Sequence, residues 1–171
     1  MRATARTALL PMMMMVALSG CAGMGLENML QPPSFRVDGS QQAHLRLLAP
    51  SFERPAGGAA VRLYARVGNP NPVGLTLTRL VGSLRLEGRD AARVDFPLGV
   101  PLQAGGEALV PIDIALDFND LPGLAEVARN ALTGRAINYS LDGTVGVDAG
   151  LLRQLSFGPM TLLSGELRAT R

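Results

Sequence analysis

The sequence is poor in the side chains that usually perform chemistry. It has one cysteine, one histidine and no tryptophan, and all sixteen basic residues are arginine. One cysteine cannot form a disulfide within the chain, and one cysteine with one histidine cannot supply the spacing of a zinc site. His44 stands among apolar residues on an expected edge strand, which favours a structural role. No Gly-x-Ser-x-Gly motif or phosphate-binding loop is present, so we expect no enzyme, no metal site and no cofactor.

The chain also has little excess charge once its first twenty residues are set aside. Arg2 and Arg6 are the only charged residues there, so fourteen basic and fourteen acidic residues remain in the rest of the chain. A neutral domain without a basic cluster argues against nucleic-acid binding.

A long apolar run is missing as well. The apolar stretch 8–18 has about eleven residues, which is too short for a helix that spans a bilayer. It follows two arginines and precedes Leu18-Ser19-Gly20-Cys21. A secretory signal peptide typically has a basic N-terminal region, a short apolar run and small residues before the cleavage site.

The end of this leader resembles the lipobox of bacterial lipoprotein precursors, in which Leu18, Ser19 and Gly20 precede the modified Cys21. The resemblance implies that residues 1–20 are removed and that Cys21 carries a diacylglycerol thioether and an N-acyl chain. The membrane is then a partner through the lipid anchor. Alanine rather than aspartate at position 22 favours the outer membrane of the cell envelope, facing the periplasm. An ordinary signal peptide that happens to contain a cysteine is the alternative.

After the leader, the sequence divides into a tether and a domain. Residues 21–41 contain prolines, glycines and serines with little periodicity, which is typical of a flexible spacer. Residues 42–171 alternate apolar and polar side chains with a period of two, as half-buried strands do. The clearest strands are expected at 61–67, 75–86, 108–116 and 137–147, with a bulge near Arg79–Leu80, and weaker ones at 43–49, 92–98 and 155–168, the last broken by Gly158-Pro159.

One segment has helical spacing instead. Between Asn119 and Thr133 the apolar residues return every three or four positions, and Gly134 follows as a C-terminal cap. About seven strands with one short helix predict an all-β fold, an antiparallel β-sandwich.

The segment after the strand 61–67 is the most distinctive part of the sequence. Asn69-Pro70-Asn71-Pro72 leads into a leucine-rich strand that ends at Glu87-Gly88, and Tyr139-Ser140-Leu141-Asp142-Gly143 follows later. This order resembles the late embryogenesis abundant type 2 family, also called the WHy (water stress and hypersensitive response) domain, over about residues 42–170. The resemblance implies an immunoglobulin- or fibronectin type III-like sandwich and a role in desiccation, osmotic or envelope stress without catalysis.

The Asn-Pro-Asn-Pro segment also has a physical interpretation of its own. Each proline holds the asparagine before it in an extended conformation and removes an N–H group. Each asparagine amide can bond the main-chain groups that a chain reversal leaves over. A rigid corner between strands is therefore favoured, and a ligand-binding loop is the alternative.

Paired carboxylates are the remaining candidates for chemistry. Asp113 and Asp117 share one strand face, about 13 Å apart between their Cα atoms at the usual strand rise, which is long for an acid–base pair. We expect a solvated face, opposite arginines such as Arg62 or Arg66. Asp142 and Asp148 receive the same interpretation.

Three functions stay open at this stage. The first is a binding or protective module for envelope proteins or lipids under stress. The second is a carrier of a small apolar or lipid ligand, and the third is an accessory subunit of an envelope complex that pairs through strand edges. The sequence does not determine the oligomeric state.

Overall fold

The described part of the chain is mostly β-structure. The computed structural model describes residues 30–118, 125–150 and 154–170. The strands within them are β1 (Ser34–Val37), β2 (His44–Leu48), β3 (Gly58–Gly68), β4 (Leu75–Leu86), β5 (Arg89–Leu102), β6 (Glu107–Asp117), β7 (Ile137–Asp148) and β8 (Gln154–Thr170), and the helix is α1 (Ala125–Thr133). The predicted class, mostly β with one short helix, is confirmed.

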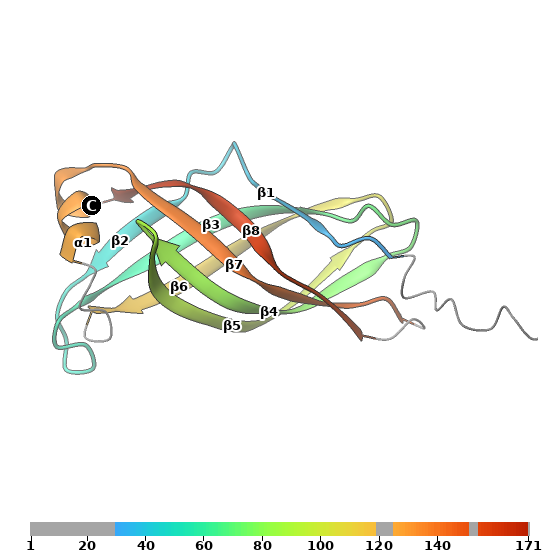
Figure 1. Cartoon of the computed structure of the whole chain (residues 1–171), viewed down its shortest axis with the longest axis horizontal. Coiled ribbons are helices and arrows are strands. Elements are labelled where there is room, and N and C mark those ends of the chain that lie inside the picture. The colour runs from blue at the N-terminus through green and yellow to red at the C-terminus, as the bar shows by residue number, and fades with distance from the viewer. Residues whose placement is uncertain (1–29, 119–124, 151–153, 171) are drawn as a thin grey trace, which may run out of the picture.

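The eight strands form one continuous, strongly curved sheet. Its order is β1-β3-β2-β8-β7-β4-β5, and β6 pairs with the other edge of β3 over the whole length of that strand. The pairs are antiparallel except that β2 runs parallel to β8, through His44, Leu45 and Arg46. This short parallel contact joins the β1–β3–β6 half of the sheet to the β4–β5–β7–β8 half (Figure 1). A purely antiparallel arrangement was predicted from the sequence, and the parallel β2–β8 pair departs from that prediction.

The core lies inside the curve of the sheet and draws on both halves. β3 turns Val61, Leu63, Ala65 and Val67 inward, and β7 does the same with alternate residues from Ile137 to Val147. The helix contributes Val127 and Ala131 to the same cluster. Leucine, valine and isoleucine fill this core as the period-two pattern predicts, and their removal from water is the main force that holds the halves together.

The folded domain begins earlier than the sequence indicates. Residues 34–37 fall within the predicted tether, but they form β1 and pair with residues 65–68 of β3. The boundary at residue 42 is therefore wrong. Only Phe35 of β1 packs against the core, so the strand is held mainly by its pairing with the edge of β3. For the same reason its sequence shows almost no alternation of apolar and polar residues.

Two local features were predicted correctly, and two other expectations were wrong. The register between β4 and its neighbours shifts between Leu77 and Arg79, where a bulge was expected. Gly134 follows α1 with a φ of 70°, as a C-terminal cap requires. Gly158-Pro159 does not end the strand, since β8 continues to Thr170, although its pairing with β7 shifts register at this point. Leu132, one of the apolar residues whose spacing predicted a helix between Asn119 and Thr133, was expected on the buried face but is exposed.

Two glycines face each other across the β4–β7 pair. Gly82 of β4 is the register partner of Gly143 of β7. A Cβ atom on Gly82 would press against the carbonyl oxygen of Asp142, and one on Gly143 would press against that of Val81. Only glycine allows the two backbones to approach this closely.

Gly82→Ala should therefore lower the free energy of unfolding by about 2 kcal/mol, the usual cost of overpacking. Chemical denaturation of the purified protein measures this loss. Gly39→Ala is the matched control, because a Cβ there meets nothing within 4 Å, and its change should stay within about 0.5 kcal/mol. Equal stability of the two variants would show that the close approach relaxes at no cost.

Candidate functional site

The Asn-Pro-Asn-Pro segment forms the corner between β3 and β4. It starts directly after Gly68 and lies at the pole of the molecule opposite α1, where β1 also begins (Figure 1). Asn69 and Asn71 are buried, whereas Pro70 and Pro72 are exposed. Two buried amides must find hydrogen-bond partners, because unpaired buried polar groups are costly.

Asn69 holds the corner to the next turn. Its side-chain amide donates to the carbonyl oxygen of Val73 at 2.7 Å and to that of Gln103 at 3.0 Å. Its main-chain N–H donates to the carbonyl oxygen of Gly106 at 2.9 Å. The β3–β4 corner and the β5–β6 turn are thus fixed to each other by one residue.

Asn71 holds the corner to the N-terminal segment. The main-chain N–H of Gln31 donates to Asn71 Oδ1 at 2.7 Å, and Asn71 Nδ2 donates to the carbonyl oxygen of Gln31 at 2.9 Å. This pair imitates a main-chain bridge between strands. Asn71 also donates from its main-chain N–H and from Nδ2 to Asn69 Oδ1, each at 3.0 Å.

These bonds leave little of the corner for a ligand. Both amide oxygens and both amide nitrogens of Asn69 and Asn71 have partners inside the protein. The exposed surface of the segment is formed by proline rings, which donate no hydrogen bond. The geometry fits a corner that fastens three separate segments to one another.

The predicted lipidation site lies outside the described residues. Cys21, Leu18, Ser19 and Gly20 precede residue 30, so the lipid anchor stays a prediction. Across the described ranges, no helix has the length and apolar character needed to cross a membrane.

The other candidate residues are placed on the surface of the sheet. Arg62 of β3 donates to the opposite Asp113 of β6, with Nη2 2.9 Å from Oδ2, as the cross-strand interpretation predicts. Arg66 pairs instead with Asp38. Asp142 accepts from Ser140 and Thr161, and Asp148 accepts from the N–H of Gly150.

His44 lies in an interior strand and not at an edge. β2 pairs with β3 on one side and with β8 on the other, so the expected edge position is wrong. The histidine ring approaches Tyr64 at 6.5 Å between ring centroids. Within residues 30–118, 125–150 and 154–170, no three histidine, cysteine, aspartate or glutamate side chains come together in a way that could hold a metal ion.

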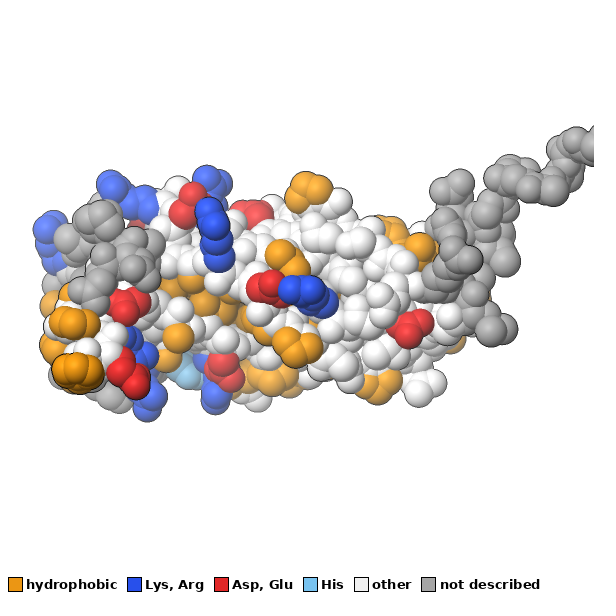
Figure 2. Space-filling model, turned by 90° about the horizontal axis from the view of Figure 1, so that it is seen from below, with side chains coloured by type: hydrophobic (Ala, Val, Ile, Leu, Met, Phe, Trp, Pro, Cys, Tyr) orange, Lys and Arg blue, Asp and Glu red, His pale blue; other side chains and the backbone are white. Residues whose placement is uncertain are grey.

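Charges of both signs are interspersed on the surface. Figure 2 shows arginine and acidic side chains next to each other, with most of the arginines of this face near the α1 pole. Arg79 with Asp95 and Arg85 with Asp90 are exposed pairs of this kind. Exposed pairs contribute little to stability, and their mixture of signs does not form an electrostatic docking surface.

Asp38 is a buried carboxylate that the sequence analysis missed. Ser40 Oγ donates to its Oδ2 at 2.6 Å, and Arg66 Nη2 donates to its Oδ1 at 2.9 Å. The hydrogen bond from Ser40, followed by that from Arg66, lowers the pKa of Asp38 below its ordinary value of 3.8. The residue fixes the loop between β1 and β2 to β3. An Asp-Gly-Ser sequence is typical of a turn, but residues 21–41 were expected to form a tether, and the partner of Asp38 on β3 depends on the pairing of β1.

This pKa has a consequence for acid stability. A carboxylate whose pKa is lower in the folded protein contributes stability that is complete above pH 3.8 and is lost as the pH falls through the lower folded value. Asp38→Asn should therefore reduce the melting temperature at neutral pH, and the difference in melting temperature from the unmodified protein should shrink as the pH falls below 3.8. Thermal melts across this range measure the effect.

Asp90→Asn is the control for this prediction. It removes an exposed pair with Arg85, so the melting temperature should hardly change. If the melting temperatures of the Asp38→Asn variant and the unmodified protein differed by the same amount at every pH, the stabilising role of the ionised Asp38 would be contradicted.

Comparisons with known proteins support the architecture. The family model LEA_2, described as late embryogenesis abundant protein, matches residues 64–160, from β3 into β8. An Arabidopsis thaliana protein, AT1g01470, has a similar solution structure with a TM-score of 0.55 and 17% identity, over 83% of this chain and 85% of that one. The solution structure of a late embryogenesis abundant (LEA) protein, At2g46140.1, has a TM-score of 0.53 and 17% sequence identity, and the match covers 85% of this chain and 75% of that one. At a sequence identity of 17%, the similarity to these two structures shows a shared fold and nothing finer. No curated protein matched the chain by sequence comparison.

Proposed function

Because this chain belongs to the LEA_2 family of late embryogenesis abundant proteins, we propose that it is a stress-protective module anchored by lipid to the bacterial cell envelope. The match to the family model over residues 64–160 is the observation that carries the stress-related role. The domain contacts envelope proteins or lipids and helps them survive drying or osmotic stress. It acts without catalysis and without a cofactor beyond the acyl groups on Cys21.

The N-terminal end of the domain supports the anchored arrangement. Gln31 is fastened to Asn71 at the pole opposite α1. Nine residues separate Cys21 from Gln31, and an extended chain of that length reaches about 30 Å. A lipidated Cys21 would therefore hold the corner pole near the outer membrane, with the α1 pole facing the periplasm.

Two finer assignments are part of the same proposal. The order of the Asn-Pro-Asn-Pro corner, the leucine-rich β4 and the Tyr139–Gly143 segment supports the WHy branch of the family. One core enclosed by two halves of the sheet supports an immunoglobulin- or fibronectin type III-like sandwich.

Survival of a deletion strain after drying and osmotic shock tests the protective role. We expect the deletion to reduce survival and the unmodified gene to restore it. An unrelated lipoprotein expressed at the same level is the control and should not restore survival. Equal survival of the deletion and parent strains would contradict the proposal.

A further inference from the structure

A pocket opens where the chain leaves the sheet between β1 and β2. Val37 pairs with Ala65 and His44 pairs with Arg62, so six residues, 38–43, stand opposite only two residues of β3. The surplus residues form a loop that stands away from β8. Between the loop and β8 lies a pocket of about 570 Å³, a volume typical of sites for small molecules.

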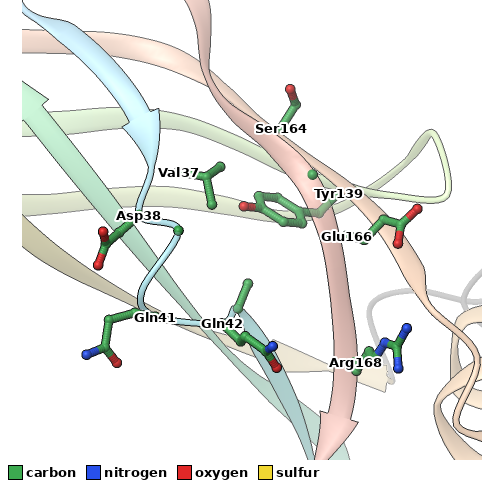
Figure 3. A pocket seen from close by; sticks show the side chains of 11 residues that line it. Val37, Asp38, Gln41, Gln42, Tyr139, Ser164, Glu166 and Arg168 are labelled. Atoms are coloured by element: carbon green, nitrogen blue, oxygen red, sulfur yellow. The ribbon is translucent and has the colours of Figure 1, made fainter.

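Tyr139 of β7 forms the floor of this pocket. The residue is only 4% exposed, and its ring passes close to Gly165 of β8, where a Cβ atom would lie 3.3 Å from the ring. In Figure 3 the hydroxyl group points toward Val37, across the pocket from β8. Among the described residues, no side chain or main-chain group forms a hydrogen bond with this hydroxyl. The ring is buried, but the hydroxyl oxygen is not one of the enclosed, unpaired polar atoms and opens into the pocket. It is therefore a hydrogen-bonding group that a ligand can reach.

The walls of the pocket carry further unused polar groups. The side chains of Gln41, Gln42 and Ser164 have no hydrogen bond within the described part of the chain. Glu166 and Arg168 stand at the rim with opposite charges. The carboxylate of Asp38 is already bound to Ser40 and Arg66, and in Figure 3 it points away from Tyr139.

This lining excludes several ligand classes. Val37 and Ala43 are the only aliphatic side chains in it, which is too little apolar surface for an acyl chain. An anion would find only Arg168, with the carboxylate of Glu166 also in the lining. A cation would find only Glu166, because Asp38 is engaged. The remaining groups are amides and hydroxyls, which both donate and accept hydrogen bonds.

We propose that this pocket binds a neutral polyhydroxylated small molecule, a sugar or polyol, with the hydroxyl of Tyr139 at its floor. Neighbouring hydroxyl groups on such a ligand each donate and accept a bond, which complements the amides of Gln41 and Gln42 and the hydroxyls of Tyr139 and Ser164. Burial raises the pKa of Tyr139, so the phenol keeps its proton at neutral pH and can donate it in a hydrogen bond. This inference does not depend on the proposed stress role.

Titration of the purified protein with glucose, trehalose and sorbitol, followed by amide NMR, tests the proposal. We expect saturable shifts for at least one of the three, concentrated at Gln41, Gln42, Ser164 and Gly165. Tyr139→Phe removes one oxygen atom and keeps the ring, and it should weaken this binding about tenfold. Gln42→Ala, at an exposed position, should also weaken binding and avoids any effect on the core.

Tyr64→Phe is the matched control. Tyr64 is the other tyrosine of the chain and does not line the pocket, so this variant should bind as the unmodified protein does. Three results would each overturn the proposal: no saturable shift with any of the three compounds, unchanged affinity in Tyr139→Phe, or saturation of the same resonances by inorganic phosphate instead.

Discussion

Cys21→Ser should transfer the protein from the membrane fraction to the soluble fraction almost completely. The leader resembles that of a lipoprotein precursor, and acyl chains contribute about 0.8 kcal/mol for each buried CH₂ group. Several chains on one residue anchor a protein firmly, and serine cannot form the thioether. The chain after residue 20 has equal numbers of basic and acidic residues, so its net charge adds no strong attraction to an anionic lipid surface. Ultracentrifugation of lysed cells, with labelled palmitate as a second readout, measures the change.

Ser19→Ala is the control for this experiment. It keeps a small residue in the lipobox, so both membrane fractionation and palmitate labelling should persist. A Cys21→Ser protein that stays with membranes through a high-salt wash would contradict lipid anchoring through this residue.

Asn69→Asp should be the most damaging isosteric change in the folded domain. The amide nitrogen that donates to the carbonyl oxygens of Val73 and Gln103 would become a carboxylate oxygen facing them. The carbonyl oxygen of Val73 would lose this donor, and that of Gln103 would keep only the N–H of Gly106. A buried negative charge beside both oxygens should cost about 3 kcal/mol or more at neutral pH. Denaturant titration at pH 7 measures the loss.

The same variant should show a distinctive pH dependence. Burial among carbonyl oxygens raises the pKa of the new carboxyl group above its value in the unfolded chain. The folded variant then binds a proton that the unfolded chain releases, so the loss of stability should shrink as the pH falls toward 4.

Gln103→Glu is the control for Asn69→Asp. It makes the same chemical change in the neighbouring turn, but the side chain is exposed, so stability should change by no more than about 0.5 kcal/mol. Equal effects of the two substitutions would show that the buried network of the corner is unimportant.

Sequence patterns predicted most of the sheet because burial on one face imposes a period of two. Val61 to Val67 and Ile137 to Val147 alternate over enough residues to identify β3 and β7. The slip in alternation near Arg79 marked the bulge, and Gly134 marked the end of α1. These features depend on neighbours along the chain, so their signals are local.

Features that depend on distant partners could not be predicted in this way. β1 is held by an edge that β3 provides. The asparagines of the corner were expected to bond main-chain groups, but the partners Gln31 and Gln103 lie 40 and 34 residues away along the chain. The pocket above Tyr139 arises because six residues stand opposite two, which becomes visible only when the register of both strands is known.

The parallel contact between β2 and β8 joins segments that lie far apart along the chain. Leu45 of β2 finds its partner in Ala169 of β8, and a very long loop must close before the two residues can meet. Closing a long loop costs entropy, and contacts between such remote segments make folding slow. We therefore expect the local β4–β5 and β7–β8 pairs to form before the parallel ladder between β2 and β8.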